Sequence, residues 1–195
     1  MSLIYGIGIN DSDHPVKVRV NGERIWCPYY RRWSQMMARC YSPATLKNQK
    51  TYKRVSVCKD WIRFSNFEKW MKEQDWAGQH LDKDILGDGL IYSPENCAFV
   101  SRAANNLIAW RCQPGEYHKR TGVYKISSGD SFYFLANGCG RKKEDRFYSE
   151  MEARMAWFEV KINRAKEIAK KEKDSRIRSF YVEKVESVLL PHIVG

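Results

Sequence analysis

The first regular pattern along the chain is an alternation of apolar and basic residues. Val16-Lys17-Val18-Arg19-Val20 has a period of two, which predicts a β-strand. Asn21-Gly22 follows it, and Arg24-Ile25-Trp26 supplies a second extended segment. Because Asn-Gly is a residue pair that two-residue hairpin turns prefer, these segments predict a β-hairpin.

The pattern then changes to the 3.6-residue period of an amphipathic helix. Its apolar positions are Tyr30, Trp33, Met37 and Tyr41, and the arginines off this face are Arg31, Arg32 and Arg39. Because helical spacing is what burial requires, we predict that the aromatic stripe is core. The arginines are candidates for phosphate contact or for a solvated face.

A short strand at 55–57 and another helix come next. Ser65 and Glu68 have the spacing of a capping box at the start of that helix. Its inward positions are then Phe67, Trp70 and Met71. A small finger cannot fold alone, so the aromatic-rich segment 26–76 is expected to supply the core beneath the next motif.

Between residues 80 and 105 the chain predicts a strand, a polar loop, a second strand and a helix. Asp82 ends the first strand, Asn96 stands at the second, and Asn105 lies in the helix. Asp and Asn oxygens suit a hard cation such as Mg²⁺, which takes few protein ligands and keeps room for a phosphate. The alternative is an ordinary acidic turn around Gly87 and Gly89.

A second set of patterns follows Cys112–Gly115 and a short basic linker at His118–Gly122. Segments 123–126 and 132–136 predict a hairpin, and 146–148 a third strand. Ser149 and Glu152 are expected to cap a long helix. Its predicted apolar stripe is Met151, Met155, Phe158, Ile162, Ala165 and Ile168 or Ala169.

Composition favours a polyanionic partner. The chain has 195 residues, with 34 Lys and Arg against 23 Asp and Glu, a formal net charge of +11, and 13% aromatic residues. Such a basic, aromatic-rich chain is typical of nucleic-acid binding. Without an apolar run long enough to span a bilayer, and without the pattern of a signal peptide, we expect a cytoplasmic protein with no membrane partner.

The cysteines predict buried thiols. They are Cys27, Cys40, Cys58, Cys97, Cys112 and Cys139, and no two form a Cys-x-x-Cys pair. Structural zinc sites usually use such close pairs, so local spacing makes zinc an unexpected cofactor. A zinc site built from distant cysteines is the alternative.

The segment from His80 to Asn105 resembles the phage-type branch of the HNH, or ββα-metal finger, nuclease family. The resemblance rests on Leu81-Asp82-Lys83-Asp84-Ile85-Leu86, on Tyr92-Ser93-Pro94-Glu95-Asn96-Cys97-Ala98-Phe99-Val100, and on the Asn that follows. It implies that Asp82 and Asn105 bind one Mg²⁺ or Mn²⁺ ion and that Asn96 braces the loop.

The same resemblance leaves the catalytic base open. Lys83 stands where the family has a His, and a Lys is normally protonated at neutral pH. If residues 80–84 are extended, His80, Asp82 and Asp84 share one face and Lys83 lies on the other. His80 is therefore the second candidate base, and a solvated His before a strand is the alternative.

Residues 119–170 resemble an Apetala-type, ethylene-response-factor-like DNA-binding domain. The resemblance rests on Thr121-Gly122-Val123-Tyr124 and on Phe147-Tyr148-Ser149-Glu150-Met151-Glu152-Ala153, although the usual Trp of the second strand is absent. It implies that the sheet lies in the major groove of DNA. The candidate DNA-binding residues are Lys125, Tyr133, Asn137, Arg141, Lys142, Lys143 and Arg146. A module for protein contact is the alternative.

The expected fold class is therefore α+β with two domains. Residues 1–114 are expected to hold a central ββα-metal finger supported by helices, with an N-terminal extension. Residues 119–195 are expected to hold a three-stranded antiparallel sheet with one long packed helix, a basic helix and a C-terminal tail.

The expected function is metal-dependent hydrolysis of double-stranded DNA, in the cytoplasm of an infected bacterial host. Two alternatives stay open. One is a catalytically inactive DNA-binding regulator that keeps the fold. The other is a phage protein that binds a host defence or replication protein.

Overall fold

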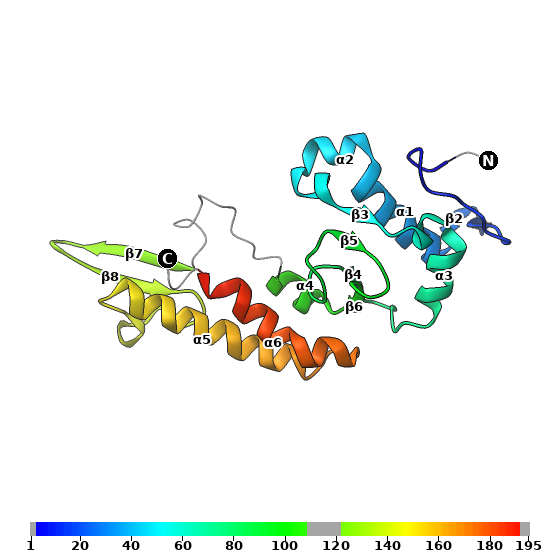
Figure 1. Ribbon diagram of the computed structural model, residues 1–195. Coiled ribbons are helices and arrows are strands. Elements are labelled where there is room, and N and C mark those ends of the chain that lie inside the picture. The colour runs from blue at the N-terminus through cyan, green and yellow to red at the C-terminus, as the bar shows by residue number, and fades with distance from the viewer. Residues whose placement is uncertain (1–2, 109–121, 192–195) are drawn as a thin grey trace. The chain divides into compact units, whose positions relative to one another are not determined.

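The computed structural model describes residues 3–108 and 122–191, and the chain divides into two compact units, Met1–Ser101 and Arg102–Gly195 (Figure 1). Both units combine helices with two-stranded sheets, so the fold is α+β, as the sequence predicts. The unit boundary lies earlier than expected, because α4 (Arg102–Ile108) packs on helices of the second unit. The expected end of the first domain, Cys112–Gly115, lies outside the described residues.

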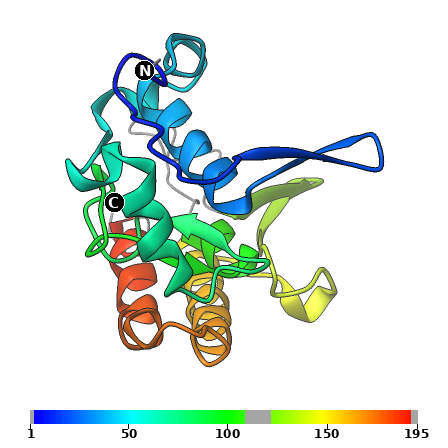
Figure 2. The same cartoon turned by 90° about the vertical axis from the view of Figure 1, so that its right-hand side faces the viewer.

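The first unit carries the predicted hairpin, formed by β1 (Lys17–Val20) and β2 (Glu23–Trp26). Asn21 and Gly22 have φ angles of 51° and 83°, which a type I′ turn requires at both positions. All strand residues of the hairpin are exposed, and Figure 2 shows it projecting from the helices of its unit.

The core of this unit forms around α1 (Pro28–Tyr41) and α3 (Phe64–Lys72). Trp33 is 0% exposed and its indole Nε1 donates a 2.7 Å hydrogen bond to the Trp61 carbonyl. The predicted stripe is confirmed, with Tyr30, Trp33 and Met37 buried and Tyr41 half-buried. Shorter helices of the unit are α2 (Pro43–Asn48), η1 (Lys50–Arg54) and η2 (Asp60–Ile62).

The start of α3 differs from the prediction of a capping box. The N-cap is Arg63, without a side-chain cap bond, and Asp11 accepts hydrogen bonds from the Ser65 backbone N–H at 2.9 Å and from its hydroxyl at 2.8 Å. Glu68 contacts His14 and Lys72. The prediction of a Ser65–Glu68 capping box is therefore wrong. The Asp11 carboxylate, from a distant segment, accepts the hydrogen bonds at the start of this helix instead.

Two small sheets complete the unit. β3 (Ser56–Val57) pairs in parallel with β5 (Ile91–Tyr92). β4 (His80–Asp82) pairs antiparallel with β6 (Ala98–Val100), with His80 opposite Val100 and Asp82 opposite Ala98. The long connection from β4 to β6 thus starts at Asp82 and contains the polar loop of the motif.

In the second unit, β7 (Val123–Ser128) and β8 (Ser131–Ala136) form the second predicted hairpin. The expected third strand is reduced to one antiparallel bridge between Phe134 and Phe147, and η3 (Lys143–Asp145) precedes it.

Two long helices, α5 (Glu150–Ala169) and α6 (Ser175–Leu189), lie side by side in this unit (Figure 1). The predicted stripe is confirmed for the C-terminal half of α5, where Ile162, Ala165, Ile168 and Ala169 are buried. For the N-terminal half of α5 the predicted stripe is wrong, because Met151 and Met155 are exposed, while Ala153 and Trp157 are buried. Trp157 takes the inward position because it packs closely on Gly122, at the start of β7.

Helix α6 docks within its own unit. α6 buries Ile177, Tyr181, Val185 and Leu189, and the Tyr181 hydroxyl donates a 2.9 Å hydrogen bond to the Ala104 carbonyl of α4. Residues 119–170 are therefore only part of a larger packed unit. Among the described helices, none combines the length and apolar character needed to cross a membrane.

Candidate functional site

Asp82 ends β4 and turns the chain. Its Oδ1 accepts hydrogen bonds from the backbone N–H groups of Asp84 and Ile85, at 2.8 and 2.9 Å, which is an Asx turn. The Asp82 side chain is buried, and burial, with the nearby Asp84, raises the pKa of its carboxyl despite these hydrogen bonds and Lys83. Oδ2 has no hydrogen-bond partner among the described residues, so it is the Asp82 oxygen that can accept a ligand.

The Asx turn corrects the expectation that residues 80–84 are extended. The strand ends at Asp82, so the alternation holds for His80 and Asp82 but not for Lys83 and Asp84. His80 is half-buried and shares a strand face with Asp82, as the period of two predicts. Lys83 turns into the interior instead of facing away.

Lys83 lies in a buried cage that the sequence does not reveal. Its side chain is 7% exposed, and its Nζ lies 2.9 Å from the Asp84 Oδ1. The same Nζ lies 5.5 Å from the ring centre of Tyr52 and 5.6 Å from that of Tyr92. Ring faces and a carboxylate are groups that attract an ammonium.

A second cation borders the same cage. Arg39 Nη1 donates a 3.4 Å hydrogen bond to the Tyr92 hydroxyl, and burial raises the pKa of Tyr92, which keeps that hydroxyl neutral. Arg39 and Lys83 thus flank one neutral phenol. The helical pattern of α1 predicts Arg39 as a phosphate candidate. The link between Arg39 and Lys83 depends on Tyr92, which lies far along the chain.

Asn96 holds the loop between β4 and β6. Its backbone N–H donates to Ser93 Oγ and its Nδ2 donates to the Ile91 carbonyl, both at 3.3 Å. A Cβ atom at Gly87 would lie 2.9 Å from Asn96 Cγ, so the loop closes on the Asn96 side chain only because residue 87 is Gly. The contacts are those of a residue that braces a loop.

Asn105, the other expected metal ligand, lies half-buried on α4. It follows Ala104, which is fully buried, and precedes Asn106, which is exposed. Asn105 belongs to the second unit, whereas Asp82 belongs to the first.

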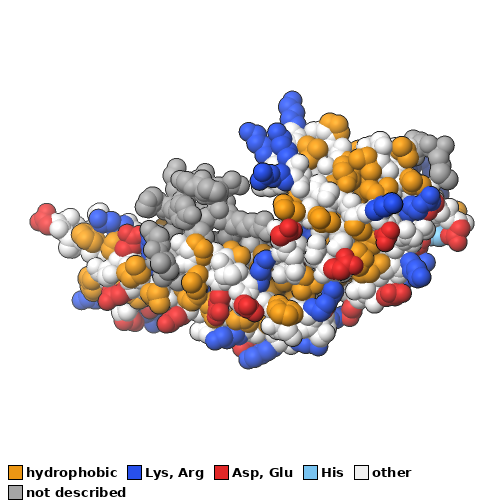
Figure 3. All heavy atoms as spheres, in the orientation of Figure 1, with side chains coloured by type: hydrophobic (Ala, Val, Ile, Leu, Met, Phe, Trp, Pro, Cys, Tyr) orange, Lys and Arg blue, Asp and Glu red, His pale blue; other side chains and the backbone are white. Residues whose placement is uncertain are grey.

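Exposed basic residues gather over α2 and η1 of the first unit (Figure 3). They are Lys47, Lys50, Lys53 and Arg54. None of them makes an ion pair within the described part of the chain. η1 also contains Tyr52, which contacts Lys83, so this basic surface borders the Lys83 cage.

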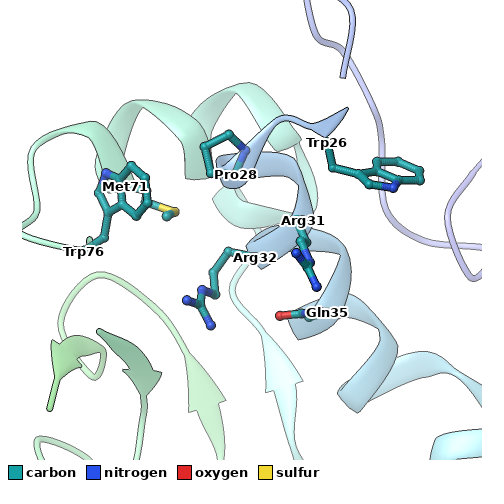
Figure 4. Close-up of a pocket in the computed structure, with 7 residues that line it drawn as sticks. All are labelled: Trp26, Pro28, Arg31, Arg32, Gln35, Met71 and Trp76. Atoms are coloured by element: carbon teal, nitrogen blue, oxygen red, sulfur yellow. The ribbon is translucent and has the colours of Figure 1, made fainter. Parts of the chain in front are cut away.

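An open pocket of ≈ 350 Å³ lies at the start of α1. Its lining residues are Trp26, Pro28, Arg31, Arg32, Gln35, Met71 and Trp76, and Figure 4 shows the two arginines and Gln35 reaching from one helix. Arg32 donates a 3.0 Å hydrogen bond to the Gln79 carbonyl, and burial, with Arg39 and Arg31, lowers its pKa. Paired guanidinium groups beside indole rings suit a phosphate with an attached base.

In the second unit, the open face of the hairpin carries part of the predicted DNA-binding set. Arg146 lies over the Tyr133 ring, with 4.2 Å from its Cζ to the ring centre, and its buried Nε has no hydrogen-bond partner among the described residues. Asn137 and Arg141 line an open pocket beside Leu135.

The other predicted DNA-binding residues lie elsewhere in this unit. Lys125 pairs with the buried Phe134, so it shares the opposite face of the hairpin and contacts the Phe132 ring at 3.9 Å. Lys142 and Lys143 are exposed at η3. The structure thus brings Tyr133 and Arg146 together and separates Lys125 from them.

Among the described residues, no cysteine forms a disulfide. Cys40 and Cys97 are buried, whereas Cys27, Cys58 and Cys139 are half-buried, so the prediction of buried thiols holds for two of these five. Burial raises the pKa of Cys40 to about 11. Cys112 lies outside the described residues.

Comparison with protein-family models, with curated proteins and with solved structures gives no match to this chain.

Proposed function

We propose that this protein binds double-stranded DNA and hydrolyses its phosphodiester bonds as a phage-type, HNH-like, metal-dependent endonuclease. The observation that carries the proposal is the arrangement around Asp82: a buried carboxylate ends β4, keeps Oδ2 without a partner, and is followed by a loop that Asn96 braces. β6 returns antiparallel to β4, and α4 with Asn105 follows directly. This is the order of strand, loop, strand and helix that a ββα-metal finger needs.

The donor set fits a hard cation. Asp82 Oδ2 and the Asn105 amide oxygen are the ligands that Mg²⁺ or Mn²⁺ prefers, and such an ion, when bound, polarises a phosphodiester and its attacking water. The chain's own residues supply the rest. Asn96 keeps the loop in place, Lys83 and Arg39 provide positive charge for a phosphate, and His80, on the face of Asp82, is the side chain suited to accept a proton.

DNA contact is supported on both units by basic and aromatic side chains. The first unit offers the α2–η1 surface and the arginine pocket of Figure 4, and the second offers Tyr133 and Arg146. Phosphate contacts would position the duplex, and Arg146 would reach a base edge. The pocket and the α2–η1 surface add residues of the first unit to the predicted DNA-facing set, which lies in the second unit.

Binding to duplex DNA is expected to weaken steeply with salt, and less steeply after the α2–η1 surface is neutralised. Each lost phosphate contact lowers the slope of log affinity against log salt by about 0.9, so replacing Lys47, Lys50 and Lys53 with Gln should reduce it stepwise. Gel-shift titrations over several salt concentrations measure this slope. Lys69→Gln, which changes an exposed lysine on α3, is the matched control. An unchanged slope in the triple variant would show that the α2–η1 surface does not contact the DNA.

Arg146→Ala is expected to weaken specific DNA binding by about 1–3 kcal/mol, because the guanidinium is held over Tyr133 with donors to spare. Lys125→Ala removes a cation of the same hairpin from its opposite face and should have a much smaller effect. Fluorescence anisotropy with a selected DNA site compares the two. Equal losses would show that charge alone, and not the open face, matters.

A catalytically inactive DNA-binding regulator is the second candidate. The observation that favours it is the Lys83 cage, where the Lys that stands in place of the His of HNH nucleases is buried against Asp84 and two rings. This candidate predicts DNA binding without cleavage at any metal concentration. Binding to a host protein is the third candidate, which Tyr148, Met151 and Met155 favour as exposed apolar residues of one unit.

A further inference from the structure

A group of three potential metal ligands lies at the base of the β1–β2 hairpin, away from Asp82. The ligand atoms of His14, Cys27 and Glu68 all lie within 4.8 Å of one another. His14 Nε2 lies 3.0 and 3.2 Å from the two Glu68 carboxylate oxygens. We propose that these three side chains bind one Zn²⁺ ion, which clamps the hairpin to α3. This site stands apart from the proposed nuclease function and does not depend on it.

The fold brings the three ligands together from three segments. His14 lies shortly before β1, Cys27 directly follows β2, and Glu68 lies in the middle of α3. The Cys27 N–H donates a 2.9 Å hydrogen bond to the Val16 carbonyl, which closes the base of the hairpin between the first two ligands. One ion at this position would fix both ends of the exposed hairpin to a core helix.

The orientation of His14 suits a metal ligand. Ser12 Oγ accepts from the His14 N–H at 3.2 Å and donates to the His14 carbonyl at 2.7 Å, so the backbone here is fixed. Nδ1 lies 3.5 Å from the Pro15 carbonyl, and a metal-bound His typically donates its other ring N–H to such a group. Without an ion, Nε2–H donates to the Glu68 carboxylate, and Zn²⁺ would take the place of that proton.

The donor chemistry selects zinc over the harder cations. An imidazole nitrogen, a thiolate and a carboxylate oxygen match the ligands of Zn²⁺, whereas Mg²⁺ prefers oxygen alone. Three protein ligands leave a fourth position for water. Glu68 also lines an open pocket of ≈ 500 Å³, which gives solvent and an incoming ion access to the group.

Binding of Zn²⁺ would exchange the present partners of Glu68 for the ion. Glu68 is 7% exposed, and its partners are His14 and the Lys72 ammonium, 3.1 Å from Oε1. Cys27 Sγ caps no helix N–H, although Cys27 is the N-cap residue of α1. Zn²⁺ with a thiolate and a carboxylate forms a neutral set, and it would replace the ammonium of Lys72, whose side chain is 54% exposed and free to swing away.

Titration of the metal-free, full-length protein with Zn²⁺ against a chromophoric chelator tests the site. We expect one tightly bound equivalent that excess Mg²⁺ does not displace, and a thiolate-to-metal absorption band when Co²⁺ replaces Zn²⁺. Cys27→Ser should remove the absorption band. It should also lower the affinity for Zn²⁺ by more than the roughly 10- to 100-fold loss that is typical when a group that only supports a ligand is removed. Ser is a favoured N-cap residue, so this variant keeps the start of α1.

Two further variants separate a metal site from an ion-pair network. Cys58→Ser changes another half-buried cysteine and should leave Zn²⁺ affinity unchanged. Lys72→Met removes the competing cation and should tighten Zn²⁺ by about two- to fivefold. The proposal is overturned if the wild-type protein binds no more Zn²⁺ than Cys27→Ser does, or if the Co²⁺ absorption band is missing. A lower Zn²⁺ affinity in Lys72→Met would also overturn it.

Discussion

Replacing Asp82 with Asn is expected to abolish Mg²⁺-dependent cleavage of DNA while leaving the protein folded. The Asn side chain keeps an oxygen that can accept from the N–H groups of Asp84 and Ile85, so the turn after β4 survives. It removes the only carboxylate of the proposed metal pair. Plasmid nicking at saturating Mg²⁺ or Mn²⁺ measures the loss. Asp88→Asn, an exposed acid of the same loop, should cleave like wild type.

Asp82→Asn also has an expected signature in stability. Burial raises the pKa of Asp82 above its unfolded value, so its favourable contribution exists below the unfolded pKa and is lost as pH rises through the folded pKa. At neutral pH the ionised carboxylate therefore opposes folding. The variant should have the higher free energy of unfolding at pH 7, and the difference should shrink in acid. A variant that is both inactive and less stable would point to a structural role alone.

The same cleavage assay identifies the proton acceptor. His80→Ala is expected to lower the cleavage rate by about 10²- to 10⁴-fold, as the loss of a general base does. Lys83→Arg keeps the positive charge between the rings of Tyr52 and Tyr92 and should remain active. An inactive Lys83→Arg beside an active His80→Ala would assign the proton transfer to Lys83. Inactivity of wild type on all duplex and single-stranded substrates would favour the regulator.

Trp33→Ala is expected to destabilise the first unit by about 3–5 kcal/mol. The side chain is fully buried between Tyr30 and Phe64, and its loss leaves a large cavity and an unpaired Trp61 carbonyl. Urea unfolding followed by tryptophan fluorescence reports mainly on this unit. Trp26→Ala, with a 43% exposed ring stacked on Tyr30, should cost at most about 1.5 kcal/mol.

Elements that depend on near neighbours could be predicted from the sequence. The Asn21-Gly22 hairpin and the buried stripe of α1 follow from residues within a few positions of each other, and the structure has both. The motif order around Asp82 was also visible, because Asp82, Asn96 and Asn105 mark three successive elements. The contacts of Asn96 with Ile91 and Ser93 are local for the same reason.

Features that depend on distant partners could not be predicted. Ser65 donates hydrogen bonds to Asp11, and Glu68 accepts one from His14, and each partner lies 54 positions away. The spacing of Ser65 and Glu68 therefore predicted a capping box that does not form. Lys83 points inward because Tyr52 and Tyr92 offer ring faces that no local pattern reveals. On α5, Trp157 displaces the expected stripe because Gly122 leaves room for its ring.

The exposed β1–β2 hairpin has a consequence for how the protein behaves in concentrated solution. Both of its strands are sheet edges with free backbone groups, and Val18, Val20 and Ile25 are exposed on one face. Such a ribbon can recruit a strand from another molecule. The basic residues Lys17, Arg19 and Arg24 on its other face repel a second copy, so their charge protects solubility. Neutralising them would therefore promote aggregation of folded molecules with little change in the free energy of unfolding.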